Sequence, residues 1–121
     1  MVKRPLVSVV DDDESVRESL PGLLAEFGYV SKAFASAEDF LASDDFRRTD
    51  CLIVDITMPG MSGPDLHQEL GRRGYDIPII FITGQRDKAA AADGQGGLAC
   101  LFKPFSDTAL LAALNAALRT T

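Results

Sequence analysis

The chain has 121 residues, of which 46% are hydrophobic, so we expect one folded domain with a substantial core and not a disordered segment. Its net charge of −6 argues against direct contact with nucleic acid, whose phosphates attract basic surfaces. No apolar run approaches the ~18 residues of a membrane helix and no leader with a cleavage site follows Met1, so we expect a cytoplasmic location without membrane contact. Cys51 and Cys100 show no metal-binding or redox spacing, and we expect both to be reduced.

Strand and helix patterns alternate along the whole chain. In chain order they predict strand 6–10, helix 14–27, strand 29–34, helix 37–42, strand 51–55, helix 64–73, strand 79–83, a helix-prone segment 88–93, strand 98–102 and helix 106–118. Gly28 is a typical helix stop, and Ser36 followed by Asp39 predicts a capped start for the short second helix. Pro21-Gly22 falls inside the first helix, where proline costs about 3 kcal/mol, so we expect a kink or a break there.

The strict alternation predicts a doubly wound α/β fold with one parallel sheet. The third and fourth predicted strands are apolar on both faces, which is typical of strands covered by helices on both sides. Right-handed crossovers place the carboxyl ends of all parallel strands along one edge. Ligands of such sheets bind just outside those ends.

Polar residues follow four of the predicted strands at that edge. They are Asp11, Asp12, Asp13 and Glu14 after the first strand, Asp55 at the end of the third, Thr83 at the end of the fourth and Lys103 after the fifth. Two carboxylates ~4 Å apart repel by roughly 4 kcal/mol at an effective dielectric constant near 20, so a cluster of three stays ionised only around a cation. Ligands that are all oxygen select Mg²⁺, with Mn²⁺ as a substitute.

This set of groups favours phosphoryl transfer. Asp55 ends a central strand, where one carboxylate oxygen can attack in line while the other touches the metal. Lys103 supplies a cation and Thr83 a hydroxyl donor to the phosphoryl oxygens, and such transfer needs mainly positioning and charge neutralisation. Each feature alone has a simpler explanation, since a run of acids favours any helix start. Their coincidence at the ends of different strands carries the prediction.

Four stretches resemble the receiver domain of two-component response regulators, in particular receivers attached to helix-turn-helix transcription regulators. They are VVDDDESVR (9–17), LIVDITMPGMSG (52–63), IIFITG (79–84) and LFKPF (101–105), and together they extend over essentially the whole chain. The resemblance implies a flavodoxin-like (βα)5 three-layer sandwich with strand order 2-1-3-4-5. It also implies that a sensor histidine kinase phosphorylates Asp55.

The resemblance further implies the roles of the metal ligands. Asp12 would bind Mg²⁺ directly and Asp11 through water, with Asp13 as an alternative register. Thr57 would give its backbone carbonyl to the metal, and its side chain would influence how fast water reaches the acyl phosphate.

The remaining implied features belong to the phosphate contacts and to the switch. Thr83 and Lys103 match the switch hydroxyl and the phosphate-binding lysine, and the Lys103-Pro104 bond is cis in many receivers. Phosphorylation would remodel the face of helix four, strand five and helix five to control an output, with a homodimer as one outcome. The sequence departs from the family at Cys100, where receivers usually carry an aromatic residue. The interval from Thr83 to Lys103 is also short, so we expect a short or mobile fourth helix, with coupling through residues 85–98 as one alternative.

Other functions are weighed against this one. A flavodoxin-like nucleotide binder lacks support, because four acids occupy the place of a phosphate-cradling loop. An aspartyl-phosphate phosphatase would need a second acid near its nucleophile, where this chain has Thr57. A receiver-like interaction module that no longer switches is favoured by Cys100 alone. His67 is expected to be a surface residue without a role, and we expect a single receiver domain without an output domain over residues 1–121.

Overall fold

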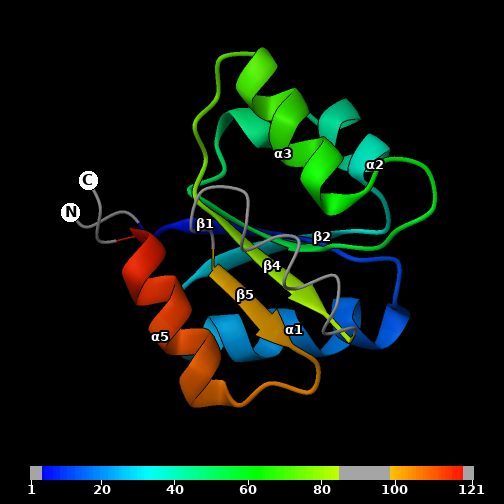
Figure 1. Ribbon diagram of the computed structural model, residues 1–121. Helices are drawn as coiled ribbons and strands as arrows, with labels where there is room; N and C mark the ends of the chain where they lie inside the picture. Colours follow the sequence, from blue (N-terminus) through cyan, green and yellow to red (C-terminus); the bar gives the residue numbers. More distant parts are fainter. Residues whose placement is uncertain (1–3, 85–98, 119–121) are drawn as a thin grey trace.

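A computed structural model describes residues 4–84 and 99–118 as a three-layer α/β sandwich (Figure 1). The elements in chain order are β1 (Leu6–Val10), α1 (Glu14–Glu26), β2 (Val30–Phe34), α2 (Ala37–Ala42), the 3₁₀ turn η1 (Asp45–Arg47), β3 (Cys51–Asp55), α3 (Gly63–Arg72), β4 (Ile79–Thr83), β5 (Ala99–Phe102) and α5 (Asp107–Leu118). The five strands are parallel in the order β2-β1-β3-β4-β5, which confirms the predicted topology.

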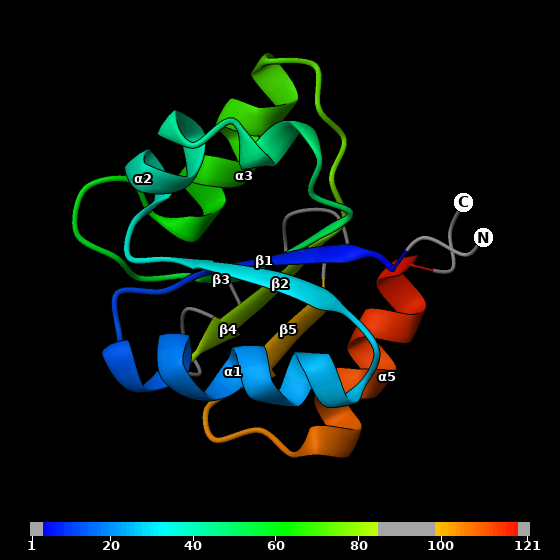
Figure 2. The same ribbon diagram turned by 180° about the vertical axis from the view of Figure 1, so that it is seen from behind.

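The helices cover both faces of this sheet. Helices α2 and α3 lie on one face and α1 and α5 on the other, as both views show (Figures 1 and 2). Strands β3 and β4 are buried at every position, which confirms that they are the apolar centre of the sheet. The sheet therefore separates two hydrophobic clusters, one under each pair of helices.

The periodicity of the strands assigns side chains to these two clusters. The cluster under α2 and α3 contains Val10, Leu52, Val54 and Phe81 from the strands and Phe40, Phe46, Leu66 and Leu70 from the helical side. The cluster under α1 and α5 contains Val7, Val9, Ile53, Ile80 and Ile82 with Leu20, Leu24, Leu110 and Leu114. Neighbouring residues of one strand alternate between the clusters because successive side chains point to opposite faces.

The predicted boundaries hold to within one residue, with one departure inside α1. The helix runs unbroken from Glu14 to Glu26 through Pro21, so of the two predicted alternatives, a kink or a break, the break does not occur. Its buried residues Leu20 and Leu24 flank the proline, and their packing against the sheet holds the helix through it. Gly28 follows in the left-handed conformation (φ 94°), as the helix stop requires. The predicted helix-prone segment 88–93 lies outside the described residues.

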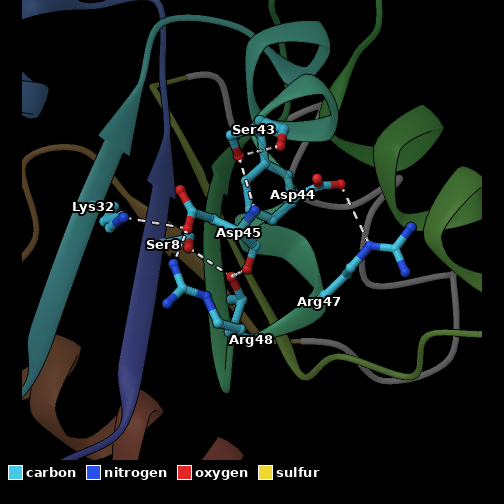
Figure 3. A network of polar contacts seen from close by, with 9 residues as sticks. Ser8, Lys32, Ser43, Asp44, Asp45, Arg47 and Arg48 are labelled. Carbon is cyan, nitrogen blue, oxygen red and sulfur yellow. Dashed lines mark hydrogen bonds and ion pairs between the residues drawn. The ribbon is translucent and has the colours of Figure 1, made fainter.

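An ionic cluster around the buried carboxylate of Asp45 fixes the turn after α2 against the first two strands (Figure 3). The Asp45 carboxylate accepts hydrogen bonds from Lys32 on β2 (3.2 Å) and from Arg48 (2.5 Å). The contacts with Arg48 first and Lys32 second hold the pKa of Asp45 below its ordinary value. Thr49 donates to the Asp45 backbone carbonyl and lies 2.7 Å from the Ser8 hydroxyl on β1. This cluster fixes the path of the chain into β3.

Two further predictions concern single side chains. Cys51 and Cys100 are both free thiols, and burial raises the pKa of Cys51 to about 12. His67 is half-buried on α3, with its ring edge-on to Phe81 of β4 at a centroid distance of 6.4 Å. His67 therefore keeps part of its surface exposed, as expected, while its ring also contacts the sheet at Phe81. Within residues 4–84 and 99–118, no helix is both long and apolar enough to cross a membrane.

Candidate functional site

The carboxyl ends of β1 and β3 bring three acids together. Val10 pairs with Val54, so the chain leaves β1 beside the end of β3 and Asp11 emerges next to Asp55. Carboxylate oxygens of Asp11, Asp12 and Asp55 all lie within 4.8 Å of one another. Three oxygen donors at this spacing can share one small divalent cation.

Asp11 is completely buried, and each part of it has a separate contact. Its Oδ1 accepts the backbone N–H of Asp13 (2.8 Å), and its backbone carbonyl accepts Nη1 of Arg17 (2.9 Å). Its Oδ2 lies 2.9 Å from Nζ of Lys103, but this ion pair lacks hydrogen-bond geometry. Among the described residues, Asp11 Oδ2 is therefore a buried atom that is held by the charge of Lys103 and accepts no hydrogen bond, which leaves it able to bind a second cation.

Asp13 has a different task from the two acids before it. Its carboxylate caps α1 by accepting the N–H (3.0 Å) and the hydroxyl (2.8 Å) of Ser15. The hydroxyl contact first, and the N–H second, lower the pKa of Asp13. Because this side chain is occupied as a helix cap, the geometry favours Asp11 and Asp12 over the alternative register that includes Asp13.

Asp55 and Lys103 face each other across the site. Asp55 Oδ1 accepts the backbone N–H of Thr57 (3.1 Å), while Oδ2 accepts Nζ of Lys103 (3.3 Å). Burial raises the pKa of Asp55, and the charge of Asp11 raises it further, against the opposing effects of Thr57 and Lys103. Burial lowers the pKa of Lys103, but its contacts with Asp11 and Asp55 outweigh burial and leave this pKa above its ordinary value. The site is thus short of positive charge around Asp55.

Thr83 and Thr57, the two threonines predicted to belong to the site, both lie near Asp55 in the chain fold. Thr83 is buried at the end of β4, one position beyond the Ile82 that pairs with Asp55, and its carbonyl accepts the N–H of Lys103 (2.8 Å). Thr57 is exposed, two residues after Asp55. The Lys103-Pro104 peptide bond is cis, as the resemblance implied.

The loop between β3 and α3 is held tightly against the end of β3, which carries Asp55. Gly63 N donates to the carbonyl of Ile56 (3.1 Å), which closes the loop at its neck. A Cβ atom at Gly63 would lie 2.6 Å from the backbone oxygen of Asp55, so this approach is open only to glycine. At the tip, Glu38 of α2 accepts the N–H of Met61 (3.1 Å). Sequence reasoning missed Glu38 and Arg17, because neither contact follows from spacing along the chain.

Strand β5, which ends just before Lys103, departs from the family pattern at the position that the sequence indicated. Cys100 is half-buried and packs against the cluster under α2 and α3, while Leu101 packs against the opposite cluster. Phe102, in register with Thr83, is 41% exposed. The proposed coupling through residues 85–98 lies outside the described residues.

Comparisons with known proteins agree on one family. Residues 7–115 match the family model described as the response regulator receiver domain. Nodulation protein W of Bradyrhizobium diazoefficiens is 43% identical over 116 residues, which cover 94% of this chain and 51% of that protein. The transcriptional regulatory protein FixJ of Azorhizobium caulinodans is 40% identical over 114 residues, covering 93% of this chain and 54% of FixJ.

Solved structures show the same likeness in three dimensions. The crystal structure of FixJ-N superimposes with a TM-score of 0.85 at 37% sequence identity, covering 99% of this chain and 98% of that one. The chain spans about half the length of the curated relatives that it matches.

Proposed function

The chain belongs to the receiver domain family of two-component response regulators, and from this premise we propose that Asp55 is its phosphoryl acceptor. The observation that supports this role is the meeting of Asp11, Asp12 and Asp55 within 4.8 Å, with the ammonium group of Lys103 3.3 Å from Asp55. Neither a helix cap nor a structural ion pair needs three clustered carboxylates of which two share one lysine.

The reaction proposed for this site is direct transfer of a phosphoryl group. An oxygen of Asp55 attacks the phosphorus of a phosphohistidine, the N–P bond breaks, and an acyl phosphate forms on the carboxylate. The leaving imidazole takes its proton from solvent. Because a carboxylate is already ionised at neutral pH, this nucleophile needs no general base.

The surrounding groups stabilise the charge of the transferred phosphoryl group. Asp11, Asp12, Asp55 and the backbone carbonyl of Thr57 would hold Mg²⁺. Bound there, the ion would neutralise phosphoryl oxygens in the transition state. Lys103 leaves the ionic contact with Asp55 Oδ2 to pair with a phosphoryl oxygen, and the Thr83 hydroxyl donates to another. Oδ2 of Asp11, whose charge meets only the ammonium of Lys103 and which accepts no hydrogen bond from the described residues, and the all-oxygen donor set fit such an ion.

A groove beside Lys103 offers a place for the phosphodonor protein. It lies between α1 and the segment joining β5 to α5, and its apolar residues are Val16, Leu20, Leu23, Pro104 and Phe105. Lys103 and Asp13 line the same groove, so a helix seated there would lie next to the acceptor pocket. Receiver domains interact with sensor kinases, and we propose this groove as the contact in this chain.

The assignment of Asp55 is tested by labelling with acetyl phosphate and Mg²⁺. Phosphorylation should approach one group per chain, be lost on treatment with hydroxylamine, and be absent in Asp55→Asn. Undiminished labelling of Asp55→Asn would overturn the assignment. A phosphatase with an aspartyl-phosphate intermediate would instead release many equivalents of phosphate per chain, whereas the receiver releases it only through slow autodephosphorylation.

A second candidate, a receiver-like module that no longer switches, is favoured by Cys100 in place of the aromatic residue. Amide spectra with and without the acyl-phosphate mimic beryllofluoride separate the two. A switching receiver shifts resonances of β5 and α5, whereas a module that no longer switches shifts only those of the strand ends.

The output of the whole protein is proposed from its relatives. Because FixJ is named a transcriptional regulatory protein, we propose that phosphorylation of this domain controls transcription, in the cytoplasm and through a separate output domain. A homodimer formed on phosphorylation would be detected by sedimentation with beryllofluoride.

A further inference from the structure

We infer that Glu38, on the surface of α2, is a positioning residue that sets the loop carrying the Thr57 carbonyl and thereby tunes Mg²⁺ binding. The inference rests on the proposed function, since it concerns the metal site of Asp55. Glu38 does not belong to the acidic cluster; it acts through the backbone of the loop.

The contact joins two elements that are distant in sequence. Glu38 Oε2 accepts the N–H of Met61 at 3.1 Å, across 23 positions of the chain. The same oxygen would lie 2.7 Å from a Cβ atom at Gly60, so the carboxylate rests directly over this glycine. Gly60 has φ +77°, a conformation that favours glycine, and the loop is thus shaped to receive the carboxylate.

The loop has few other polar constraints. Thr57 N donates to Asp55 and Ser62 N to Asp65, which belong to the flanking elements β3 and α3. Among the described residues, Glu38 is the one hydrogen-bond acceptor for residues 57–62 from a third element. The hydrogen bond from Met61 to Glu38 should therefore restrict the backbone between Met61 and Ile56, the residue whose carbonyl closes the loop.

Thr57 lies within that segment and is itself exposed. The buried side chain of Met58 anchors the loop in the hydrophobic core, while the Glu38 carboxylate holds its backbone at Met61. Without Glu38, the tip would lose a charge-assisted hydrogen bond and the carbonyl of Thr57 would sample more orientations. Groups that orient metal ligands commonly change metal affinity by tenfold or more when they are removed.

The test compares four forms of the chain: unaltered, Glu38→Ala, Glu38→Gln and Asp39→Ala. The glutamine keeps an oxygen acceptor for Met61 and removes the charge. Asp39→Ala removes one acidic charge from the neighbouring exposed position of α2, so it is the matched control for electrostatics. All three replacements are at exposed positions, and amide spectra verify the fold.

Mg²⁺ is titrated without a phosphodonor, and its dissociation constant is taken from amide shifts at the strand ends. Glu38→Ala should raise this constant by about 10-fold, whereas Glu38→Gln and Asp39→Ala should stay within about twofold of the unaltered chain. The Met61 amide should exchange faster with solvent in Glu38→Ala even without metal. Acetyl phosphate labelling of Glu38→Ala should be slow at low Mg²⁺ and recover at saturating Mg²⁺.

Three results would overturn the positioning role: an unchanged constant in Glu38→Ala, an equal loss in Glu38→Gln, or an equal loss in Asp39→Ala. The last two would show that charge, and not the hydrogen bond, matters. If the unaltered chain neither bound Mg²⁺ nor became labelled, the proposed function would fail, and the positioning role with it. If it did both and Glu38→Ala matched it, the positioning role alone would fail.

Discussion

Replacing the proposed acceptor by asparagine should make the metal-free protein more stable. Asp55→Asn keeps the shape of the side chain and the acceptor for Thr57 N but removes one of three clustered negative charges. Sites built for function commonly carry such strain, which is relieved when the functional group is removed.

The magnitude follows from the distances around Asp55. Carboxylate oxygens of Asp11 and Asp55 lie within 4.8 Å, which corresponds to a repulsion of at least ~3.5 kcal/mol at an effective dielectric constant near 20. Nζ of Lys103, 3.3 Å from Asp55, offsets this with an attraction of ~5 kcal/mol on the same scale. Two further effects act against the ionised form of Asp55: repulsion from the exposed Asp12, which solvent weakens, and the cost of burying the charge. Together with the repulsion from Asp11 they exceed the attraction of Lys103. We expect a net gain of about 1–2 kcal/mol in the free energy of unfolding.

The pH dependence identifies the cause. Because the folded-state pKa of Asp55 is raised, its ionisation costs stability, and the cost grows as pH rises from near 4 through that raised pKa. As the pH falls through 4, Asp55 becomes protonated in the folded and the unfolded state alike, so the stabilities of the two proteins should converge. Above the raised pKa, Asp55→Asn should hold its full advantage.

Urea unfolding followed by circular dichroism, in EDTA between pH 3.5 and 8, measures the difference in the free energy of unfolding. In thermal unfolding, each kcal/mol by which Asp55→Asn is more stable should raise Tm by roughly 3–5 °C. Mg²⁺ should reduce or reverse this advantage of Asp55→Asn, since tenfold excess over the dissociation constant stabilises a binding-competent chain by about 1.4 kcal/mol. If metal-free Asp55→Asn were less stable than the unaltered chain at pH 7, the attraction of Lys103 would outweigh the repulsion and our account of the site would be wrong.

Other replacements test the remaining parts of the structure. Lys103→Met leaves Asp11 and Asp55 without their cation, so it should lower metal-free stability at pH 7 by about 2–4 kcal/mol in urea unfolding and slow labelling by acetyl phosphate; unchanged stability would contradict the pairing. Gly63→Ala would place Cβ 2.6 Å from a backbone oxygen of the acceptor strand, and we expect a loss above about 2 kcal/mol in the same assay, whereas Gly71→Ala, with open space around it, serves as the control. The buried thiol of Cys51, with its pKa raised to about 12, should react with a thiol reagent at pH 8 only after unfolding, and rapid reaction in the native protein would be inconsistent with its burial.

The sequence alone determined the order of the elements and the edge at which the site forms. The strands β3, β4 and β5 are short apolar runs whose last residues are known from the pattern, so the meeting of Asp55, Thr83 and Lys103 at one edge follows from parallel topology. The cap at Ser36 was also predicted correctly, since its contact with Asp39 N is local.

Only the tertiary structure decided which groups complete the site. The sequence does not distinguish the three consecutive aspartates from one another. In the structure, Asp13 caps the start of α1, whereas Asp11 and Asp12 lie beside Asp55. Pro21 predicted a kink or a break, and packing of the helix on the sheet prevents the break. Glu38 meets Met61 because α2 docks beside the loop, and no local pattern encodes a contact across 23 positions. Periodicity fixes which face a side chain takes, whereas the docking of helices on the sheet fixes what it touches there.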